Sequence, residues 1–255
     1  MSRVWALAVN TFREAVRDRV LYSILFFAIG VLALSLAIDD ITIGDQAKVV
    51  RSVGQGAVDV FGSIIAMFLG VSVIHKELER KTVYTVLSRP LRRSTFVLGK
   101  YAGLLMTVAV EVLILVVVYS LFMWTRGELP GPTLLVSMGM LLVELALLIA
   151  WATLFSAYSA PTTAAAFTLA VFVIGHLADD IWLYGSQSES PTVQTVARTL
   201  YWALPNFEIF SIRQAAVHLD AVPWERVWSG ILYGFGYTTT VLAAAMAVFQ
   251  RKDVK

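Results

Sequence analysis

Cysteine is absent from the 255-residue chain, so it can form neither a disulfide framework nor a thiolate metal or redox site. Charge is also scarce, because only 15% of the residues are charged while 58% are hydrophobic. A chain this apolar cannot cover a water-soluble fold with a polar surface. Its net charge of +2 gives no reason to expect nucleic acid as a partner. These absences leave an integral membrane protein.

A phosphate-binding loop of the form G-x-x-x-x-G-K-[ST] is missing too. The nearest approach, Gly99-Lys100-Tyr101, lacks both the upstream glycine and the following hydroxyl residue. We therefore expect that the chain does not hydrolyse ATP, is not an enzyme and holds no cofactor of its own.

The long apolar runs predict an all-α polytopic membrane protein with six transmembrane helices, since backbone polar groups in lipid must be satisfied within each segment. The second and fifth runs are the shortest, and the second is expected to begin a few residues earlier than its apolar core. The whole chain, 1–255, is expected to form a single transmembrane domain. The six runs are Val20–Ile38, Val60–Ile74, Tyr101–Trp124, Thr133–Phe155, Thr162–Ala178 and Val227–Phe249.

Charge asymmetry predicts the orientation of these spans. With the N-terminus inside, the inner segments carry fourteen Lys/Arg against five acids, and the outer segments carry six against eleven, counting Asp59 as an outer residue. Because cytoplasmic segments are enriched in Lys and Arg, both termini are expected to be cytoplasmic.

Residues 1–19 precede the first span and do not resemble a cleavable signal peptide, because four arginines lie there and no small-x-small cleavage site follows. Apolar residues recur at helical spacing between these charges, at Val4, Leu7, Ala8, Phe12 and Ala15. The pattern predicts an amphipathic helix in the inner interface. The alternative is an irregular lead-in that only anchors the topology.

The connector 75–100 is the most charged part of the chain, with seven Lys/Arg against the two acids Glu77 and Glu79. Lys76–Leu87 is expected to form a short cytoplasmic helix. Pro90 ends it, since the residue before a proline avoids helical geometry. A second helix is expected to begin at about Leu91.

This connector resembles the signature loop of ABC-2 type transporter permeases, the membrane subunits of one class of ATP-driven exporters. The resemblance rests on Glu79-Arg80-Lys81-Thr82, Leu87-Ser88-Arg89-Pro90, Arg93, Phe96 and Leu98-Gly99-Lys100. A second similar patch is Leu204-Pro205-Asn206-Phe207-Glu208. The order of the predicted elements is similar to that of the family as well. One departure is Val83-Tyr84, where many relatives have Gly-Thr.

The resemblance implies that the connector is a coupling helix that docks into a separate ABC ATPase, two of which bind each complex and hold ATP and Mg. It also implies a second copy of the chain, or a related permease, in the plasma membrane of a bacterium or archaeon. Export would proceed by alternating access. The coupling residues would be Glu77, Glu79, Arg80, Thr82, Tyr84, Leu87, Arg89, Pro90 and Arg92. The alternative is that this charge is a solvated surface that sets the topology.

Two acids fall near the centres of predicted spans, Glu111 in the third and Glu144 in the fourth. An ionised carboxylate at that depth costs about 3 kcal/mol, so each must be protonated, paired or facing a water-filled cavity. We find no basic residue at that depth in any predicted span. Both are candidates for the translocation path, and neutral packing residues are the alternative.

Other polar residues carry weaker hypotheses. His176 and Asp180 at the outer end of the fifth span could hold a metal ion, but such pairs more often form a solvated helix end. Gly99-x-x-x-Gly103 and Gly230-x-x-x-Gly234 permit close helix contacts and could mark an interface between copies.

The segment 179–227 is the only sizeable outer region. Its helical stretch Val193–Leu204, the turn at Pro205-Asn206 and Phe207–Val217 predict helices folded onto or partly into the outer leaflet. An extracytoplasmic partner could bind there.

Two rival functions stay open: a nontransporting subunit that transmits force to an outer partner, and an integral membrane enzyme using Glu111, Glu144 or His176. The cargo cannot be inferred from the sequence.

Overall fold

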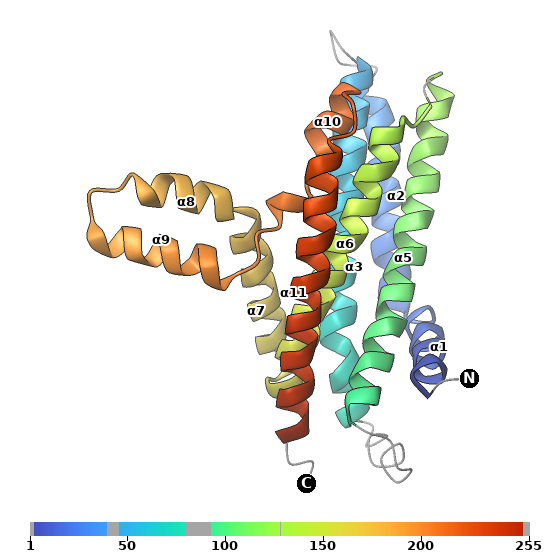
Figure 1. The fold of residues 1–255 in the computed structure, drawn as a ribbon. Helices are drawn as coiled ribbons and strands as arrows, with labels where there is room; N and C mark the ends of the chain where they lie inside the picture. The colour runs from blue at the N-terminus through green and yellow to red at the C-terminus, as the bar shows by residue number, and fades with distance from the viewer. Residues whose placement is uncertain (1–2, 40–45, 80–92, 128, 252–255) are drawn as a thin grey trace.

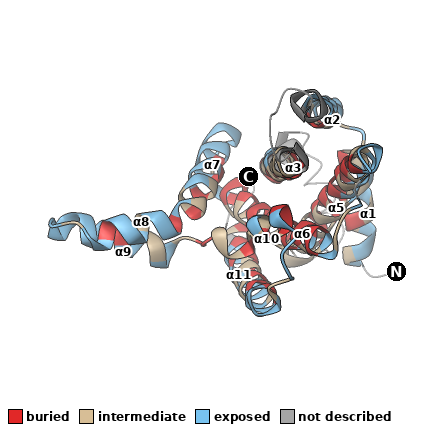
Figure 2. Ribbon diagram, turned by 90° about the horizontal axis from the view of Figure 1, so that it is seen from above, coloured by how far each residue is buried: buried red, intermediate tan, exposed pale blue. Residues whose placement is uncertain are grey.

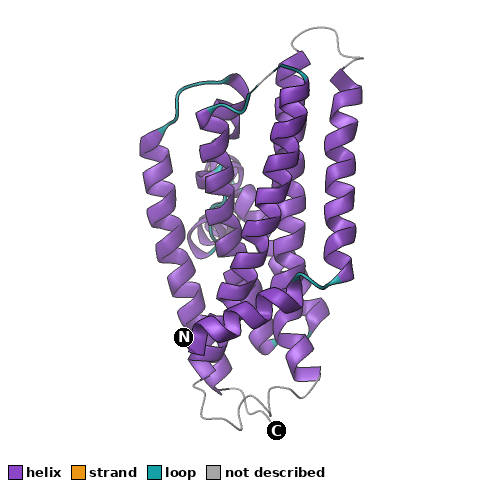
Figure 3. Cartoon of the chain, turned by 90° about the vertical axis from the view of Figure 1, so that its right-hand side faces the viewer, coloured by secondary structure: helices purple, strands orange, loops and turns teal. Residues whose placement is uncertain are grey.

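The computed structural model describes residues 3–39, 46–79, 93–127 and 129–251, and all regular structure within them is helical. The elements form a bundle with connections at both ends and a helical hairpin on one side (Figures 1 and 3). In chain order they are α1 (Arg3–Ala15), α2 (Arg19–Asp39), α3 (Gln46–Glu79), α5 (Arg93–Thr125), α6 (Pro132–Tyr158), α7 (Pro161–His176), α8 (Ala178–Ser186), α9 (Pro191–Ala203), η1 (Glu208–Phe210), α10 (Arg213–His218) and α11 (Trp224–Arg251).

Four of the six predicted spans are helices long and apolar enough to cross a membrane. They are Val50–Ser72 of α3, the whole of α5, the whole of α6 and Trp224–Gln250 of α11. The predicted fifth span is α7, which together with α8 passes the same test as a pair bent by 61°. The predicted first span is α2. Its apolar part with described side chains, Arg19–Leu34, is shorter than the 18 residues required of a candidate span. The chain is therefore an all-helical, multi-pass membrane protein in its described part.

α6 occupies the centre of the bundle. Figure 2 shows buried residues concentrated where α3, α5, α6 and α11 meet, with exposed faces turned outward. The middle of α6 is covered on every side, because Leu145, Leu147, Leu148, Ile149 and Ala150 are all fully buried. A helix that is hydrophobic all round suits this position, and its apolar run of 27 residues explains why it forms the core.

The second span begins before its apolar core, as the sequence suggested. We expected that core at Val60–Ile74, with a start a few residues earlier; α3 begins at Gln46, and its membrane-length segment begins at Val50. Asp59 therefore lies within a span, and counting it with the outer residues was wrong. The polar residues Arg51 and Gln55 interrupt the apolar pattern, yet both are buried by neighbouring helices rather than exposed to water.

The predicted N-terminal helix is present as α1, which packs on the base of α5, with Ala8, Thr11 and Ala15 buried. Lys100 of α5, which is itself buried, pairs with Glu14 of α1 at 3.6 Å. Gly99 and Gly103 allow this close approach, since a side chain on either would collide with α1. The location of α1 at the membrane interface stays a prediction.

The four glycines of the two Gly-x-x-x-Gly pairs pack against other segments of the same chain. Besides the two at α1, Gly230 faces Met140 and Gly234 faces Val143 and Phe210. The hypothesis that these glycines mark an interface between copies is therefore wrong for the described structure. A small residue permits a close helix approach, but it does not say which helix approaches.

We predict that Gly103→Ala destabilises the protein by about 1–3 kcal/mol through overpacking. A Cβ at this position would lie 2.5 Å from Thr11 Cβ and 2.6 Å from the Ala8 carbonyl oxygen. Gly139→Ala is the matched control, since nothing lies within 4 Å of a Cβ there. The control should be neutral or more stable by up to about 1 kcal/mol from helix propensity. Thermal unfolding in detergent measures both, and equal behaviour would contradict the packing of α1 on α5.

The segment 179–227 folds as a lateral hairpin followed by short helices. α8 and α9 lie against each other, with Ala197 packed on Gly185 and the rings of Trp182 and Tyr201 5.1 Å apart. The hairpin points away from the bundle (Figures 1 and 2). The predicted helix Val193–Leu204 is confirmed as α9, whereas Phe207–Val217 is divided into η1 and α10.

Candidate functional site: a polar cavity inside the bundle

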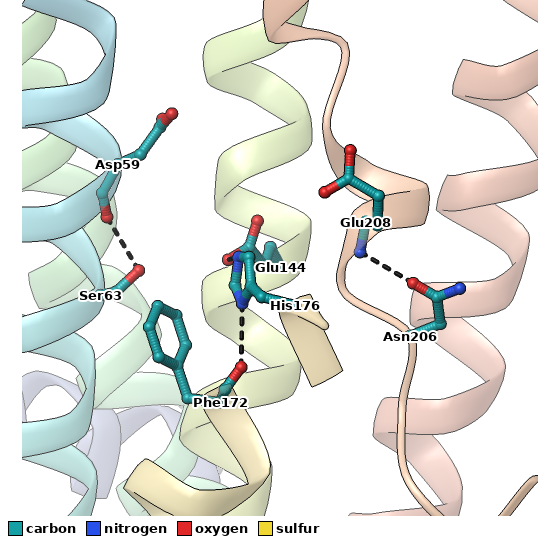
Figure 4. A network of polar contacts seen from close by, with 7 residues as sticks. All are labelled: Asp59, Ser63, Glu144, Phe172, His176, Asn206 and Glu208. Atoms are coloured by element: carbon teal, nitrogen blue, oxygen red, sulfur yellow. Dashed lines mark hydrogen bonds and ion pairs between the residues drawn. The ribbon is translucent and has the colours of Figure 1, made fainter. Parts of the chain in front are cut away.

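A cavity of about 340 Å³ lies among α3, α6, α7 and the segment from η1 to α10. Its wall is polar, because charged or hydroxyl side chains from all of these elements line it. The lining residues are Asp59, Val60, Ser63, Ser137, Leu141, Glu144, Phe172, His176, Glu208, Phe210, Ser211 and Arg213. Figure 4 shows part of this network.

Glu144 and His176 form the central contact of the cavity. Glu144 lies near the middle of α6 and is 7% exposed. His176 is the last residue of α7, and its Nε2 lies 3.3 Å from Glu144 Oε1. The other ring nitrogen, Nδ1, lies 3.0 Å from the carbonyl oxygen of Phe172 one turn earlier. These two contacts fix the orientation of the imidazole over the cavity.

This contact corrects two expectations from the sequence. We expected no basic side chain at the depth of Glu144, and we expected His176 at a solvated helix end beside Asp180. α7 instead ends inside the bundle, because the chain bends into α8 at Leu177. His176 therefore faces α6. Within the described ranges, no three His, Asp or Glu side chains are close enough together to hold a metal ion.

The sequence patch Leu204–Glu208 forms one wall behind this pair. Asn206 is buried, and its Nδ2 donates to Asp179 Oδ1 at 2.6 Å. Its Oδ1 accepts from the Glu208 N–H at 2.9 Å, and its own N–H donates to the Tyr233 hydroxyl at 3.0 Å. Asn206 therefore joins α8, η1 and α11.

Phe207, the next residue in the patch, supports the histidine. It is fully buried, and its ring stacks on His176 with the ring centres 5.4 Å apart. Its N–H donates to the Gly175 carbonyl at 3.0 Å. Gly175 is required at this point, because a Cβ there would meet the Phe207 ring and lie 2.7 Å from the Pro205 carbonyl oxygen.

Two arginines fasten α10 to the first half of α3 beside the cavity. Arg51 of α3 donates from Nε to the Val217 carbonyl at 3.0 Å. Arg213 of α10 donates in the opposite direction, from Nη2 to the Ser52 carbonyl at 2.7 Å. The Tyr119 hydroxyl of α5 donates to the Arg51 carbonyl at 3.1 Å. Charged donors to backbone carbonyls form strong hydrogen bonds, so α10 is held firmly against α3 beside the cavity.

The ionisable groups on the cavity wall are mainly acidic. Three carboxyl groups, of Asp59, Glu144 and Glu208, face one guanidinium, of Arg213, and one imidazole, of His176. Glu208 lies in the connection between spans, where burial raises the pKa of its carboxyl group, and Arg226 and His176 only partly oppose this rise. The wall therefore carries three carboxyl groups against two cationic groups if His176 is protonated, and against one if it is neutral.

Glu111 lies in a different place from Glu144. It is buried on α5 at 3% exposure and does not line this cavity. Neither of its carboxyl oxygens has a hydrogen-bond partner within the described part of the chain. The structure therefore separates the two acids that the sequence suggested as a pair.

We predict that Glu111→Leu raises the stability of the protein by about 1–3 kcal/mol, since it removes a buried polar group that lacks a hydrogen bond. Glu144→Leu is the matched variant and should lower the stability by a similar amount, because His176 loses its partner. Thermal unfolding in detergent distinguishes the two. A loss of stability in Glu111→Leu would show that this carboxyl has a partner.

The predicted coupling residues lie outside this site and mostly outside the described residues. Glu77 and Glu79 fall in the last turn of α3, but only their backbone is described. The other seven, Arg80, Thr82, Tyr84, Leu87, Arg89, Pro90 and Arg92, lie outside the described residues. Their role stays a prediction.

Sequence reasoning missed three charged lining residues, Asp59, Glu208 and Arg213, and considered His176 only as a metal ligand or an enzyme residue. Asp59 carried a usable signal, since it lies only one residue before an apolar run and continues that helix toward its start. Glu208 was noticed only as the end of the family-like patch. Arg213 carried no signal, because it follows the turn at Pro205-Asn206 in a segment that resembles an outer loop.

Comparison with protein families gives one clear result. Residues 5–254 match the family model described as ABC-2 family transporter protein. Comparison with curated proteins finds no match. Since the family model covers nearly the whole chain, including the spans, the cavity and the charged connector, the protein belongs to the ABC-2 transporter family.

Proposed function

We propose that the chain is the permease subunit of an ATP-driven exporter that works by alternating access. The observation that carries this proposal is the polar cavity lined by α3 and α6, two helices long enough to cross a membrane, together with α7 and the segment from η1 to α10. A cavity lined by charged groups is costly within a bundle of apolar helices, and in membrane proteins such groups mark substrate and ion pathways. Family membership supports the same function.

ATP and Mg would be bound by a partner ABC ATPase, in two copies per complex, and the chain itself would be no enzyme. ABC ATPase partners are general for this family. The coupling helix at 76–92 would receive the closure of the ATPase. α5 begins at Arg93, directly after that segment, and continues for 33 residues. A helix of this length can transmit a displacement at its base as a rigid body.

The transport unit would contain a second copy of the chain or a related permease. With six spans and both termini in the cytoplasm, the complex would lie in the plasma membrane of a bacterium or archaeon. In this arrangement the hydrogen bonds of Arg51 and Arg213 would hold the outer end closed. Export requires that they open when the inner end closes.

The natural absence of cysteine makes alternating access testable without a known cargo. Ser211→Cys places a thiol on the cavity wall, and Ser229→Cys on exposed α11 is the matched control. With the ATPase bound, labelling of position 211 by a membrane-impermeant maleimide should switch between the two sides of the vesicle as ATP is added and trapped with vanadate. Labelling of position 229 should not change.

The same experiments separate the rival functions. Co-purification of a stoichiometric ATPase would exclude a self-contained membrane enzyme. In a complex that hydrolyses ATP, labelling of Ser211→Cys that does not change with nucleotide would contradict transport. It would support a subunit that transmits force to a partner through 179–227.

A further inference from the structure

We propose that the polar cavity binds an organic monocation, an amine or a quaternary ammonium with a compact apolar body. The inference rests on the proposed function, because it takes this cavity as the place where cargo binds. It goes further by assigning the chemical class of the cargo.

The sign of the ligand follows from the charges on the wall. With the three carboxylates ionised, Arg213 and a protonated His176 leave one negative charge in excess, and a neutral His176 leaves two. Beyond the wall, Arg226 donates to the Glu208 carbonyl at 2.8 Å, and Asp179 accepts from Asn206. These two outer charges are opposite, and the guanidinium of Arg51, also beyond the wall, is bound to the Val217 carbonyl. One positive charge from a ligand would compensate the excess on the wall fully beside a protonated His176 and by half beside a neutral one.

Free acceptor atoms are available to hold that charge. Glu144 contacts His176 through Oε1, and its second oxygen has no hydrogen-bond partner among the residues described. The Asp59 carboxylate forms neither a hydrogen bond nor an ion pair in the same described set, since Ser63 bonds only to its backbone carbonyl. Figure 4 shows both acids on the α3 and α6 sides of the network. A carboxylate oxygen that lines a cavity and has no partner in the described set favours a ligand that donates a hydrogen bond or carries positive charge.

An anion is disfavoured by the same geometry. The guanidinium of Arg213, the one permanent cation among the described wall residues, already donates to the carbonyl and hydroxyl oxygens of Ser52 at 2.7 and 3.3 Å. An anionic ligand would have to break these bonds and approach three carboxylates.

The remaining wall argues for an organic ligand rather than a bare ion. Val60, Leu141, Phe172 and Phe210 supply apolar and aromatic surface beside the carboxylates. The faces of aromatic rings attract ammonium groups. A volume of about 340 Å³ lies within the range of small-molecule sites.

The test uses three probes of similar shape: phenyltrimethylammonium, its neutral isostere tert-butylbenzene, and the anion benzenesulfonate. Binding to the full chain in nanodiscs, with its ATPase present, is measured by calorimetry. Phenyltrimethylammonium should bind more tightly than both others. Glu144→Gln and Asp59→Asn should each weaken its binding by about tenfold or more, since each removes a charge close to the ligand. Glu144→Asp, which keeps the charge, should restore most of the affinity.

Glu111→Gln is the matched control, because this carboxyl is buried in the same bundle but does not line the cavity. It should leave binding unchanged. Equal or tighter binding of benzenesulfonate or tert-butylbenzene, or an equal loss in Glu111→Gln, would overturn the inference. Absence of cation binding in a complex whose Ser211→Cys labelling responds to nucleotide would refute the cation site and leave transport standing. Cation binding in a complex whose Ser211→Cys labelling does not respond to nucleotide would refute transport and leave the cation site standing.

Discussion

Exchanging Glu79 for arginine together with Arg89 for glutamate is expected to abolish association with the ATPase while the chain still inserts into the membrane. The proposed coupling helix carries alternating charges that would meet complementary charges in the ATPase cleft. Reversing both places like charges opposite each other, which costs several kcal/mol at an interface. The double exchange keeps the net charge of the connector, so the charge bias that orients the spans is preserved.

A matched exchange provides the control. Asp180→Arg with Arg198→Glu reverses one acid and one base in the exposed α8–α9 hairpin, which projects from the side of the bundle (Figure 1). Affinity purification of the tagged chain, followed by quantification of the bound ATPase, compares the two. The hairpin variant should retain its ATPase. If the connector variant retains it equally well, the coupling assignment is wrong.

Replacing Asn206 with leucine is expected to lower the free energy of unfolding by about 2 kcal/mol, since it leaves the partly buried Glu208 N–H without its acceptor. The substitution also removes the donor to Asp179, so α8 loses its tie to η1. Leucine has a similar size, so the effect reports the hydrogen bonds rather than a cavity. Thermal unfolding in detergent measures the loss.

The only other asparagine of the chain, Asn10, is the control. It lies on the exposed face of α1, and Asn10→Leu should change the stability by no more than about 0.5 kcal/mol. Nucleotide-dependent labelling of position 211 should be lost in Asn206→Leu and kept in Asn10→Leu. Equal stability of the two variants would show that Asn206 does not hold this wall together.

The successful predictions concern features that depend on short stretches of sequence. Long apolar runs such as Thr133–Phe155 predict helices, because a backbone in lipid has no other way to satisfy its polar groups. The helix over 1–19 followed from the spacing of residues such as Leu7 and Ala8. Family membership followed from the charged connector. Each of these patterns is local, so one sequence is enough to recognise it.

The failures concern polar residues in apolar segments. Asp59 and Arg51 resemble residues of an outer loop, yet α3 carries both within its membrane-length segment. His176 resembles a solvated helix end, yet the bend after it turns its ring toward Glu144. Arg51 and His176 find their partners in distant parts of the chain, at Val217 and Glu144.

The sequence alone was enough to establish the helical, membrane-embedded character of the protein and its family, since hydrophobicity and local motifs act along the chain. Only the tertiary structure decided which polar residues share a cavity. Glu144 meets His176, while Glu111 at a similar depth on α5 meets no partner in the described structure. The physical reason is rotation: the direction in which a helix presents a residue is set by packing against its neighbours, and composition does not encode it.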